Sequence, residues 1–239
     1  METVTRAIIV AAGIGNRLRP VTEEMPKPLV KVNGVRMIDT SIRLLKQNGI
    51  HEICIVAGYK IEQFRDAYGA DPDIRIIENP WYLKGNNITS IYAAREYLPG
   101  AFVIEGDLLV EDPTVYDPVI EKSAYCVNWM QDCPEWALKV EEGRIISCEI
   151  KGASDAYRNL GISMWTKEDG QLLAELVREQ IEGKKEWNVY WDELPLSFYK
   201  DRFDVGIRPL PIGAVTEIDT LDELIERDSS YEAYRRNRT

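Results

Sequence analysis

The hydrophobic pattern along the chain alternates between short, almost purely apolar runs and segments in which apolar residues recur every three or four positions. The apolar runs have the length of buried β-strands and lie at Ala7–Val10, Ile53–Ala57, Ile74–Glu78 and Ala101–Glu105. The segments with helical spacing between them are Asp39–Asn48, Ile61–Tyr68 and Ile88–Tyr97. This alternation predicts an α/β fold, with a mostly parallel central sheet and crossover helices on both of its faces.

The pattern changes in the second half of the chain, where the apolar runs become shorter and alternate with polar residues. We expect short strands at Ala124–Met130, Leu138–Glu141 and Arg144–Glu149, with Glu142-Gly143 as a hairpin turn. A helix should follow, because apolar residues recur with helical spacing at Leu172, Leu173, Leu176, Val177 and Ile181. A final helix is expected from Leu221 to about Tyr234. The sequence thus predicts a small β-rich part beside the parallel sheet.

A glycine-containing loop follows the first apolar run, with cationic residues close behind it. Gly13 and Gly15 free the backbone N–H groups to approach an anion, and Arg17 and Lys27 add positive charge around it. The spacing is not that of a P-loop, and Leu18 stands where a dinucleotide-binding loop has its third glycine. An ordinary strand-to-helix turn is the alternative. The neighbouring cations favour a loop that holds the phosphates of a nucleoside triphosphate.

Composition narrows the classes of partner. The chain has 239 residues, 45% of them hydrophobic, and a formal net charge of −11, so it can bury a substantial core but lacks the basic balance of a protein that binds nucleic acid or anionic membranes. The first apolar run is too short for a signal peptide or a membrane span, and we expect a cytoplasmic protein. The cysteines show no metal-binding spacing and are expected to be free, partly buried thiols: Cys54, Cys126, Cys133 and Cys148.

Two aspartates stand where acidic side chains can hold a metal ion. Asp107 follows the strand Ala101–Glu105, so its carboxylate should project from the carboxyl end of the sheet, where ligands bind in this type of fold. Mg²⁺ prefers oxygen ligands, takes one or two carboxylates and completes its shell with phosphate oxygens and water. Asp219 ends another short apolar run and offers a second carboxylate, although it could instead cap the helix that follows.

The segment Ala11–Leu29 resembles the signature A-A-G-x-G-x-R-L-x-P-x-T-x-x-x-P-K-P-L of the sugar-phosphate nucleotidyltransferase superfamily throughout. The resemblance implies a Rossmann-like nucleotidyltransferase fold over residues 1–239, with a nucleotide-binding half at 1–110 and an acceptor-binding half at 111–239. It also implies that Arg17, Lys27 and Asp107 are catalytic and that Asp107 and Asp219 bind Mg²⁺. The nucleotide-binding residues expected on this basis are Ala11, Ala12, Gly13, Gly15, Asn16, Arg17, Lys27, Asn86, Asn87 and Ser90.

The pattern N-N-x-x-S at residues 86–90 resembles the bacterial branch of CTP:phosphocholine cytidylyltransferases within this superfamily. Amide and hydroxyl groups can both donate and accept hydrogen bonds, as the edge of a cytosine base requires. Asn86 and Asn87 could alternatively do no more than start the following helix. The resemblance thus implies CTP as the nucleotide.

Aromatic and acidic residues gather in two segments of the second half, at Glu135-Trp136 and at Tyr190-Trp191-Asp192. Rings of this kind hold cations, and a nearby carboxylate adds electrostatic attraction, so the combination suits a quaternary ammonium group. The two segments also resemble the choline-binding positions of the phosphocholine enzymes. Two plainer readings remain open, in which the aromatic residues are core residues and Asp192 caps a helix that continues through Phe198.

We therefore expect a Mg²⁺-dependent cytidylyltransferase that converts CTP and phosphocholine to CDP-choline and pyrophosphate. A primary amine such as 2-aminoethylphosphonate or phosphoethanolamine remains an alternative acceptor, because Asp192 and Glu193 would also serve it as hydrogen-bond acceptors. A sugar-1-phosphate nucleotidyltransferase is the next alternative, and a non-catalytic nucleotide-binding regulatory subunit is the alternative from another class. The sequence does not indicate an oligomeric state.

Overall fold

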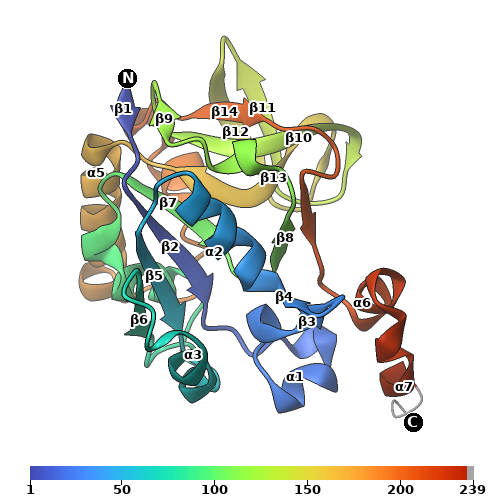
Figure 1. Ribbon diagram of the computed structural model, residues 1–239. Coiled ribbons are helices and arrows are strands. Elements are labelled where there is room, and N and C mark those ends of the chain that lie inside the picture. The colour runs from blue at the N-terminus through green and yellow to red at the C-terminus, as the bar shows by residue number, and fades with distance from the viewer. Residues whose placement is uncertain (236–239) are drawn as a thin grey trace.

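A nine-stranded sheet with the order β12-β11-β13-β7-β2-β5-β6 forms the centre of the computed structural model, which describes residues 1–235; β10 pairs with β13 and β14 beside this path (Figure 1). The strands are β1 Glu2–Thr3, β2 Arg6–Ala11, β3 Lys31–Val32, β4 Val35–Arg36, β5 Glu52–Ala57, β6 Ile74–Glu78, β7 Ala101–Glu105, β8 Leu108–Val110, β9 Val119–Ile120, β10 Ala124–Cys133, β11 Ala137–Glu141, β12 Arg144–Glu149, β13 Ala153–Met164, β14 Gly206–Pro209 and β15 Val215–Glu217. The α-helices are α1 Val21–Glu24, α2 Met37–Gln47, α3 Ile61–Tyr68, α4 Ile88–Ala93, α5 Lys167–Arg178, α6 Leu221–Arg227 and α7 Glu232–Arg235.

The first half of the sheet is parallel, as the alternation of elements predicts. Strand β2 lies between β5 and β7 and runs parallel to both, and β6 extends the sheet beyond β5. Helices α2 and α3 bury apolar residues on one face of these strands, and α4 and α5 do so on the other. Because the carboxyl ends of β2 and β7 meet at one edge, the loops that follow them lie side by side.

The second half adds long antiparallel strands that the hydrophobic pattern only partly predicts. Strand β13 pairs with β10 along nearly its whole length and also with β7, which joins the β-rich part to the parallel sheet. Both strands include polar stretches, such as Gln131-Asp132 in β10 and Ser154-Asp155 in β13, so the apolar pattern does not reveal how far these strands extend. The hairpin between β11 and β12 turns at Glu142-Gly143, where both residues have positive φ, as predicted.

Two expected helices end earlier than predicted. The helix α4 stops at Ala93, and Arg95–Tyr97 form a separate 3-10 turn. The final helix breaks at Asp228, whose extended backbone separates α6 from the 3-10 turn Ser229–Tyr231 and from α7. The Asp228 carboxylate accepts the N–H groups of Ser230 and of Asn33, far away in the sequence. This tertiary contact favours a break that the helical pattern does not show.

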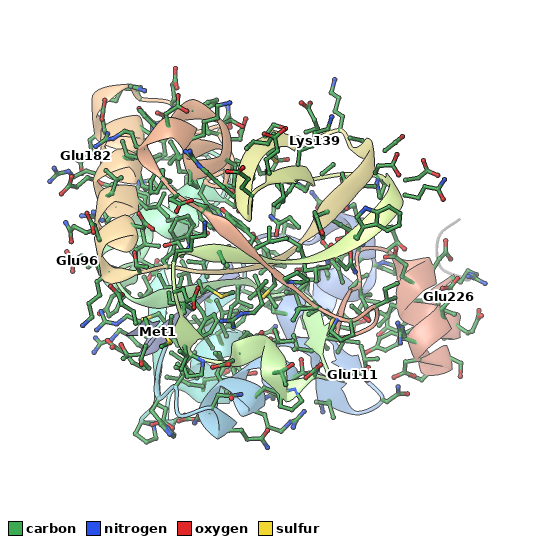
Figure 2. The ribbon with its side chains drawn as sticks, turned by 90° about the horizontal axis from the view of Figure 1, so that it is seen from above. Met1, Glu96, Glu111, Lys139, Glu182 and Glu226 are labelled. Atoms are coloured by element: carbon green, nitrogen blue, oxygen red, sulfur yellow. The ribbon has the colours of Figure 1, made fainter. Side chains whose placement is uncertain are left out.

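The remaining observations concern the surface and the thiols. The labelled acidic residues Glu96, Glu182 and Glu226 lie on the outside of the ribbon, where their charged groups reach water (Figure 2).

All four cysteines are free and three of them are buried, which confirms the expectation for the thiols. Within residues 1–235, every helix is too short or too polar to cross a membrane.

Candidate functional site

The loop after β2 folds around Lys27. Gly15 has a φ of 70°, and a Cβ there would lie 3.0 Å from both Lys27 Cβ and Thr22 Cγ2, so a side chain would crowd this contact. The Thr22 hydroxyl donates to the Gly15 carbonyl at 2.9 Å and fixes the turn. A Cβ at Gly13 would meet no atom within 4 Å, because this glycine faces open space. The loop is thus held firmly on one side and open to a ligand on the other.

Lys27 lies almost completely buried between two carboxylates. Its Nζ is 2.5 Å from Asp107 Oδ2 and 2.7 Å from Asp219 Oδ1, and Arg17 Nη2 donates to the same Asp219 oxygen at 2.7 Å. Burial alone would lower the pKa of Lys27, but the two carboxylates outweigh it and raise that pKa above its ordinary value. Lys27 is therefore a permanently charged cation at this position.

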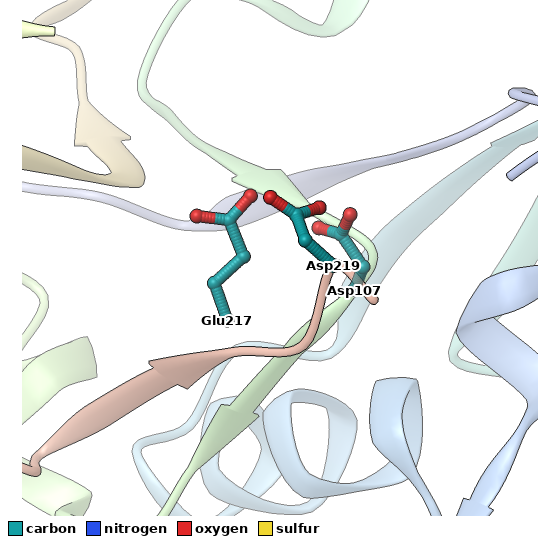
Figure 3. A group of neighbouring side chains, drawn as sticks. All are labelled: Asp107, Glu217 and Asp219. Carbon is teal, nitrogen blue, oxygen red and sulfur yellow. The ribbon is translucent and has the colours of Figure 1, made fainter. Parts of the chain in front are cut away.

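Three carboxylates converge beside Lys27, where Asp107, Glu217 and Asp219 each place one oxygen within 4.8 Å of the others (Figure 3). Glu217 also accepts from Arg158 Nη2 at 3.2 Å. Burial, followed by the charges of Asp107 and Asp219, raises the pKa of Glu217 to about 7. A cluster of oxygen ligands with this excess of negative charge has the chemistry of a Mg²⁺ site.

Sequence reasoning missed Glu217. The signal was present, because residues two apart in an extended strand face the same side, and Glu217 stands two residues before Asp219 at the end of β15. The alternative role of Asp219 as a helix cap is wrong: Thr220 is the N-cap of α6 and forms a capping box with Glu223. The Asp219 carboxylate is therefore left for Lys27 and Arg17.

The loop Asn86–Ser90 lies at the same edge, but much of its hydrogen-bonding capacity is used within the protein. Asn87 Oδ1 accepts from the Trp191 N–H at 3.1 Å, and Asn87 Nδ2 donates to Glu105 Oε1 at 3.3 Å. The Asn86 N–H donates to the Trp187 carbonyl at 2.8 Å. Neither asparagine side chain caps the first turn of α4. Asn87 thus links this loop to the segment that follows Trp187.

The aromatic residues of the second half divide into two groups. The rings of Trp136 and Tyr190 stand at right angles, 5.2 Å apart between centroids, and Tyr190 is exposed. Trp191 is 3% exposed and stacks on Tyr125 in the core, at 6.2 Å and 17°. Trp136 and Tyr190 therefore form two walls at the mouth of the site, whereas Trp191 mainly packs beneath it. The interpretation of the aromatic residues as core residues is therefore correct for Trp191, although one side of the Trp191 ring still borders the cavity.

Asp192 is 6% exposed and does not cap a helix. The turn that follows, Leu194–Phe198, has Glu193 at its N-cap position and no side-chain cap. Burial raises the pKa of the Asp192 carboxyl to about 7. Glu135, by contrast, lies nearer the surface and accepts from Arg158 Nη2 at 3.2 Å. The two acidic residues expected at the acceptor end thus have different environments.

One cavity of about 680 Å³ unites these groups. Every candidate site residue named from the sequence lines it: Ala11, Ala12, Gly13, Gly15, Asn16, Arg17, Lys27, Asn86, Asn87, Ser90, Asp107, Glu135, Trp136, Tyr190, Trp191, Asp192 and Asp219. The wall also includes residues that sequence reasoning missed: Val103, Glu105, Tyr125, Ser163 and Glu217. The first three of these missed residues belong to strands whose apolar character suggested core positions alone.

Comparison with known proteins agrees with this geometry. The family model for nucleotidyl transferases matches residues 6–123. The chain is 33% identical to a 2-aminoethylphosphonate cytidylyltransferase of Lancefieldella rimae, over 95% of this chain and 93% of that protein, and 32% identical to a choline-phosphate cytidylyltransferase of Streptococcus pneumoniae, over 91% and 94%.

Solved structures give the same picture. The CTP:phosphocholine cytidylyltransferase LicC of Streptococcus pneumoniae superimposes with a TM-score of 0.84 at 29% identity, covering 94% of this chain and 98% of that one. The inositol-1-phosphate CTP transferase of T. maritima shares the fold, with a TM-score of 0.75 at 21% identity, covering 98% of this chain and 96% of that one. With its Gly13 loop, its buried lysine and its carboxylate cluster in one cavity, the chain belongs to the nucleotidyl transferase family.

Proposed function

We propose that the protein transfers CMP from CTP to a phosphate or phosphonate oxygen of a small acceptor that carries a cationic amine. The observation that carries this proposal is the position of Lys27 among Asp107, Glu217 and Asp219, in the same cavity as the walls formed by Trp136 and Tyr190. One end of the cavity therefore suits reacting phosphates, and the other suits a cation. The names of the cytidylyltransferase relatives support CTP as the donor.

The reaction requires no nucleophile from the protein. An oxygen of the acceptor attacks the α-phosphorus of CTP, the bond from that phosphorus to the bridging oxygen breaks, and pyrophosphate leaves with the electron pair. Arg17 and Lys27 lie where they can hold the triphosphate and offset the negative charge that develops on it. Catalysis then rests on positioning and electrostatics.

The carboxylates of Asp107, Glu217 and Asp219 would hold Mg²⁺, and their three convergent oxygens fit the ligand preference of that ion. Bound there, the ion would neutralise charge on the phosphate oxygens. Lys27 and Arg17 contact the same carboxylates in the structure, so these side chains also orient the acidic groups.

The acceptor end supports a cationic head group. The perpendicular rings of Trp136 and Tyr190 line this end and can contact an acceptor that carries a cation. Phosphocholine and 2-aminoethylphosphonate both carry such a head group. They are the acceptors after which the two cytidylyltransferase relatives are named. A sugar phosphate lacks the positive charge, and a regulatory subunit would have no need of the buried Lys27 and its three carboxylates.

The test is release of pyrophosphate by the purified protein with CTP, Mg²⁺ and each of four acceptors: phosphocholine, 2-aminoethylphosphonate, phosphoethanolamine and glucose-1-phosphate. We expect turnover with at least one phospho-amine or phosphonate, and loss of turnover in Asp219→Asn. The exposed Asp66→Asn is the matched control and should retain activity. Turnover with glucose-1-phosphate alone would contradict the proposal, as would nucleotide binding without turnover.

A further inference from the structure

A buried recess extends the cavity behind the acceptor end. We define it by Val103, Glu105, Tyr125, Ser163 and Asp192, all of which line the cavity. Ser163 pairs with Val103 on one side and with Tyr125 on the other, so these side chains lie next to one another across β7, β13 and β10. Glu105 continues the same face of β7, and Asp192 lines the recess from the segment between α5 and β14.

The recess holds two carboxyl groups and no basic side chain. Neither Glu105 nor Asp192 forms an ion pair with any Lys, Arg or His within residues 1–235. Glu105 receives only one hydrogen bond from a side chain, from Asn87 Nδ2 at 3.3 Å. Asp192 is buried and Glu105 is partly buried, and acidic groups in such positions are normally compensated by a cation or by several donors. Among residues 1–235 that compensation is missing.

The Tyr125 hydroxyl gives a second, independent observation. Tyr125 is 1% exposed, and its hydroxyl lies against the Asp192 carboxyl but makes no hydrogen bond within the usual limits of distance and angle. A buried hydroxyl without a partner is rare in folded proteins. The recess therefore combines surplus hydrogen-bond acceptors with an unsatisfied hydroxyl group.

We propose that the recess is a subsite for a primary ammonium group, and that Glu105, Tyr125 and Asp192 make the enzyme select a primary amine over a quaternary one. This inference rests on the proposed function and specifies its acceptor. In the occupied subsite the N–H bonds of the ammonium group point to the carboxyl oxygens of Glu105 and Asp192, and the Tyr125 hydroxyl, unpartnered in the free protein, donates to Asp192 from behind. A trimethylammonium group has no N–H bond to offer and needs more room.

The position of the recess agrees with a short acceptor. Glu105 stands two residues before Asp107 in the chain, so the ammonium subsite adjoins the carboxylates beside which the reacting phosphorus group must lie. A two-carbon linker joins the two charged ends in both 2-aminoethylphosphonate and phosphoethanolamine. Trp136 and Tyr190 then cover the linker at the mouth of the cavity.

The experiment compares kcat/KM for phosphoethanolamine, its N-methyl and N,N-dimethyl derivatives, and phosphocholine. We expect a stepwise fall with each methyl group, and at least about a tenfold preference for the primary amine, the loss typical of hydrogen bonds to charged groups. The kcat/KM for 2-aminoethylphosphonate is measured beside that for phosphoethanolamine. The ratio of the two values shows whether the enzyme prefers a phosphonate or a phosphate ester. Equal or greater kcat/KM for phosphocholine would overturn the inference and leave the proposed function standing. Absence of turnover with all five acceptors would refute the proposed function instead.

The variants Asp192→Asn and Tyr125→Phe test the residues themselves. Asp192→Asn should reduce the preference for the primary over the quaternary amine about tenfold, and Tyr125→Phe should reduce it less, because it acts through Asp192. A merely structural role would lower kcat/KM for both acceptors equally and leave the preference unchanged, which would refute the assignment. Asp66→Asn and Tyr116→Phe, which lie outside the cavity, should leave the preference unchanged.

Discussion

The buried Asp192 carboxyl should make the protein less stable as pH rises. Its pKa lies at about 7 in the folded protein, against an ordinary value of 3.8, because burial disfavours the charged form. Between these two values the folded protein binds more protons at this site than the unfolded chain does, so the free energy of unfolding falls with rising pH. Asp192→Asn removes the titrating group and with it this loss of stability.

The size of the effect follows from the separation of the two pKa values. A separation of about three pH units corresponds to about 4 kcal/mol, of which about 3 kcal/mol arises between pH 5 and pH 8. The free energy of unfolding of Asp192→Asn, minus that of the unmodified protein, should therefore be about 3 kcal/mol higher at pH 8 than at pH 5, which means that the variant is relatively more stable at pH 8. Groups that titrate in this range without sensing the charge of Asp192 cancel in the comparison.

Urea unfolding at pH 5 and pH 8, followed by tryptophan fluorescence, measures this difference. The exposed Asp66→Asn controls for the loss of one negative charge and should show a much smaller change between the two pH values. If Asp192→Asn changes stability equally at both pH values, or is relatively less stable at pH 8, the reasoning is refuted. The carboxyl would then be compensated within the free protein, and the recess would need no cation.

Three further predictions concern the reacting end and its connection to the acceptor end. Lys27→Met should lower kcat for pyrophosphate release about 10²- to 10³-fold, because it removes the buried cation beside the reacting phosphates; retention of activity would exclude Lys27 from catalysis. Asn87→Leu should raise the KM of the acceptor more than that of CTP, because it removes the hydrogen bond to the Trp191 N–H; an effect on CTP alone would refute the link. Gly85→Ala should lower both thermal stability and acceptor binding, since its Cβ would lie 2.3 Å from the Trp187 carbonyl oxygen, whereas Gly183→Ala, with no atom nearer than 3.6 Å, should change neither.

Local sequence patterns predicted the parallel half of the fold and the placing of the Gly13 loop and Asp107 at one end of the cavity. The strands β2, β5, β6 and β7 are short apolar runs with clear boundaries, and parallel strands bring the ends of β2 and β7 together wherever the rest of the chain lies. The loop at Gly13 and the carboxylate of Asp107 could therefore be placed at one edge. Their position depends on neighbouring residues in the chain and on sheet geometry alone.

The rest depends on contacts that the chain makes only once it is folded. Tyr125 belongs to an apolar strand, and nothing near it in the sequence indicates that one face of the strand borders a cavity, whereas Glu105 stands two residues before Asp107, as Glu217 does before Asp219. Trp191 belongs to the same aromatic segment as Tyr190, yet it turns into the core. The break at Asp228 is stabilised by a hydrogen bond from the distant Asn33, which no local pattern could reveal.

The contacts between the loop at Gly85 and the segment after Trp187 bear on how this family can change its substrates. The Trp187 carbonyl lies so close to Gly85 that only glycine fits there, and the Asn86 N–H and the Asn87 side chain bind the same segment. A chimera that imports residues 187–193 from a relative would therefore carry a backbone shaped for another loop. Residues 84–90 and 187–193 should be inherited and exchanged together, as one module shared by the two ends of the cavity.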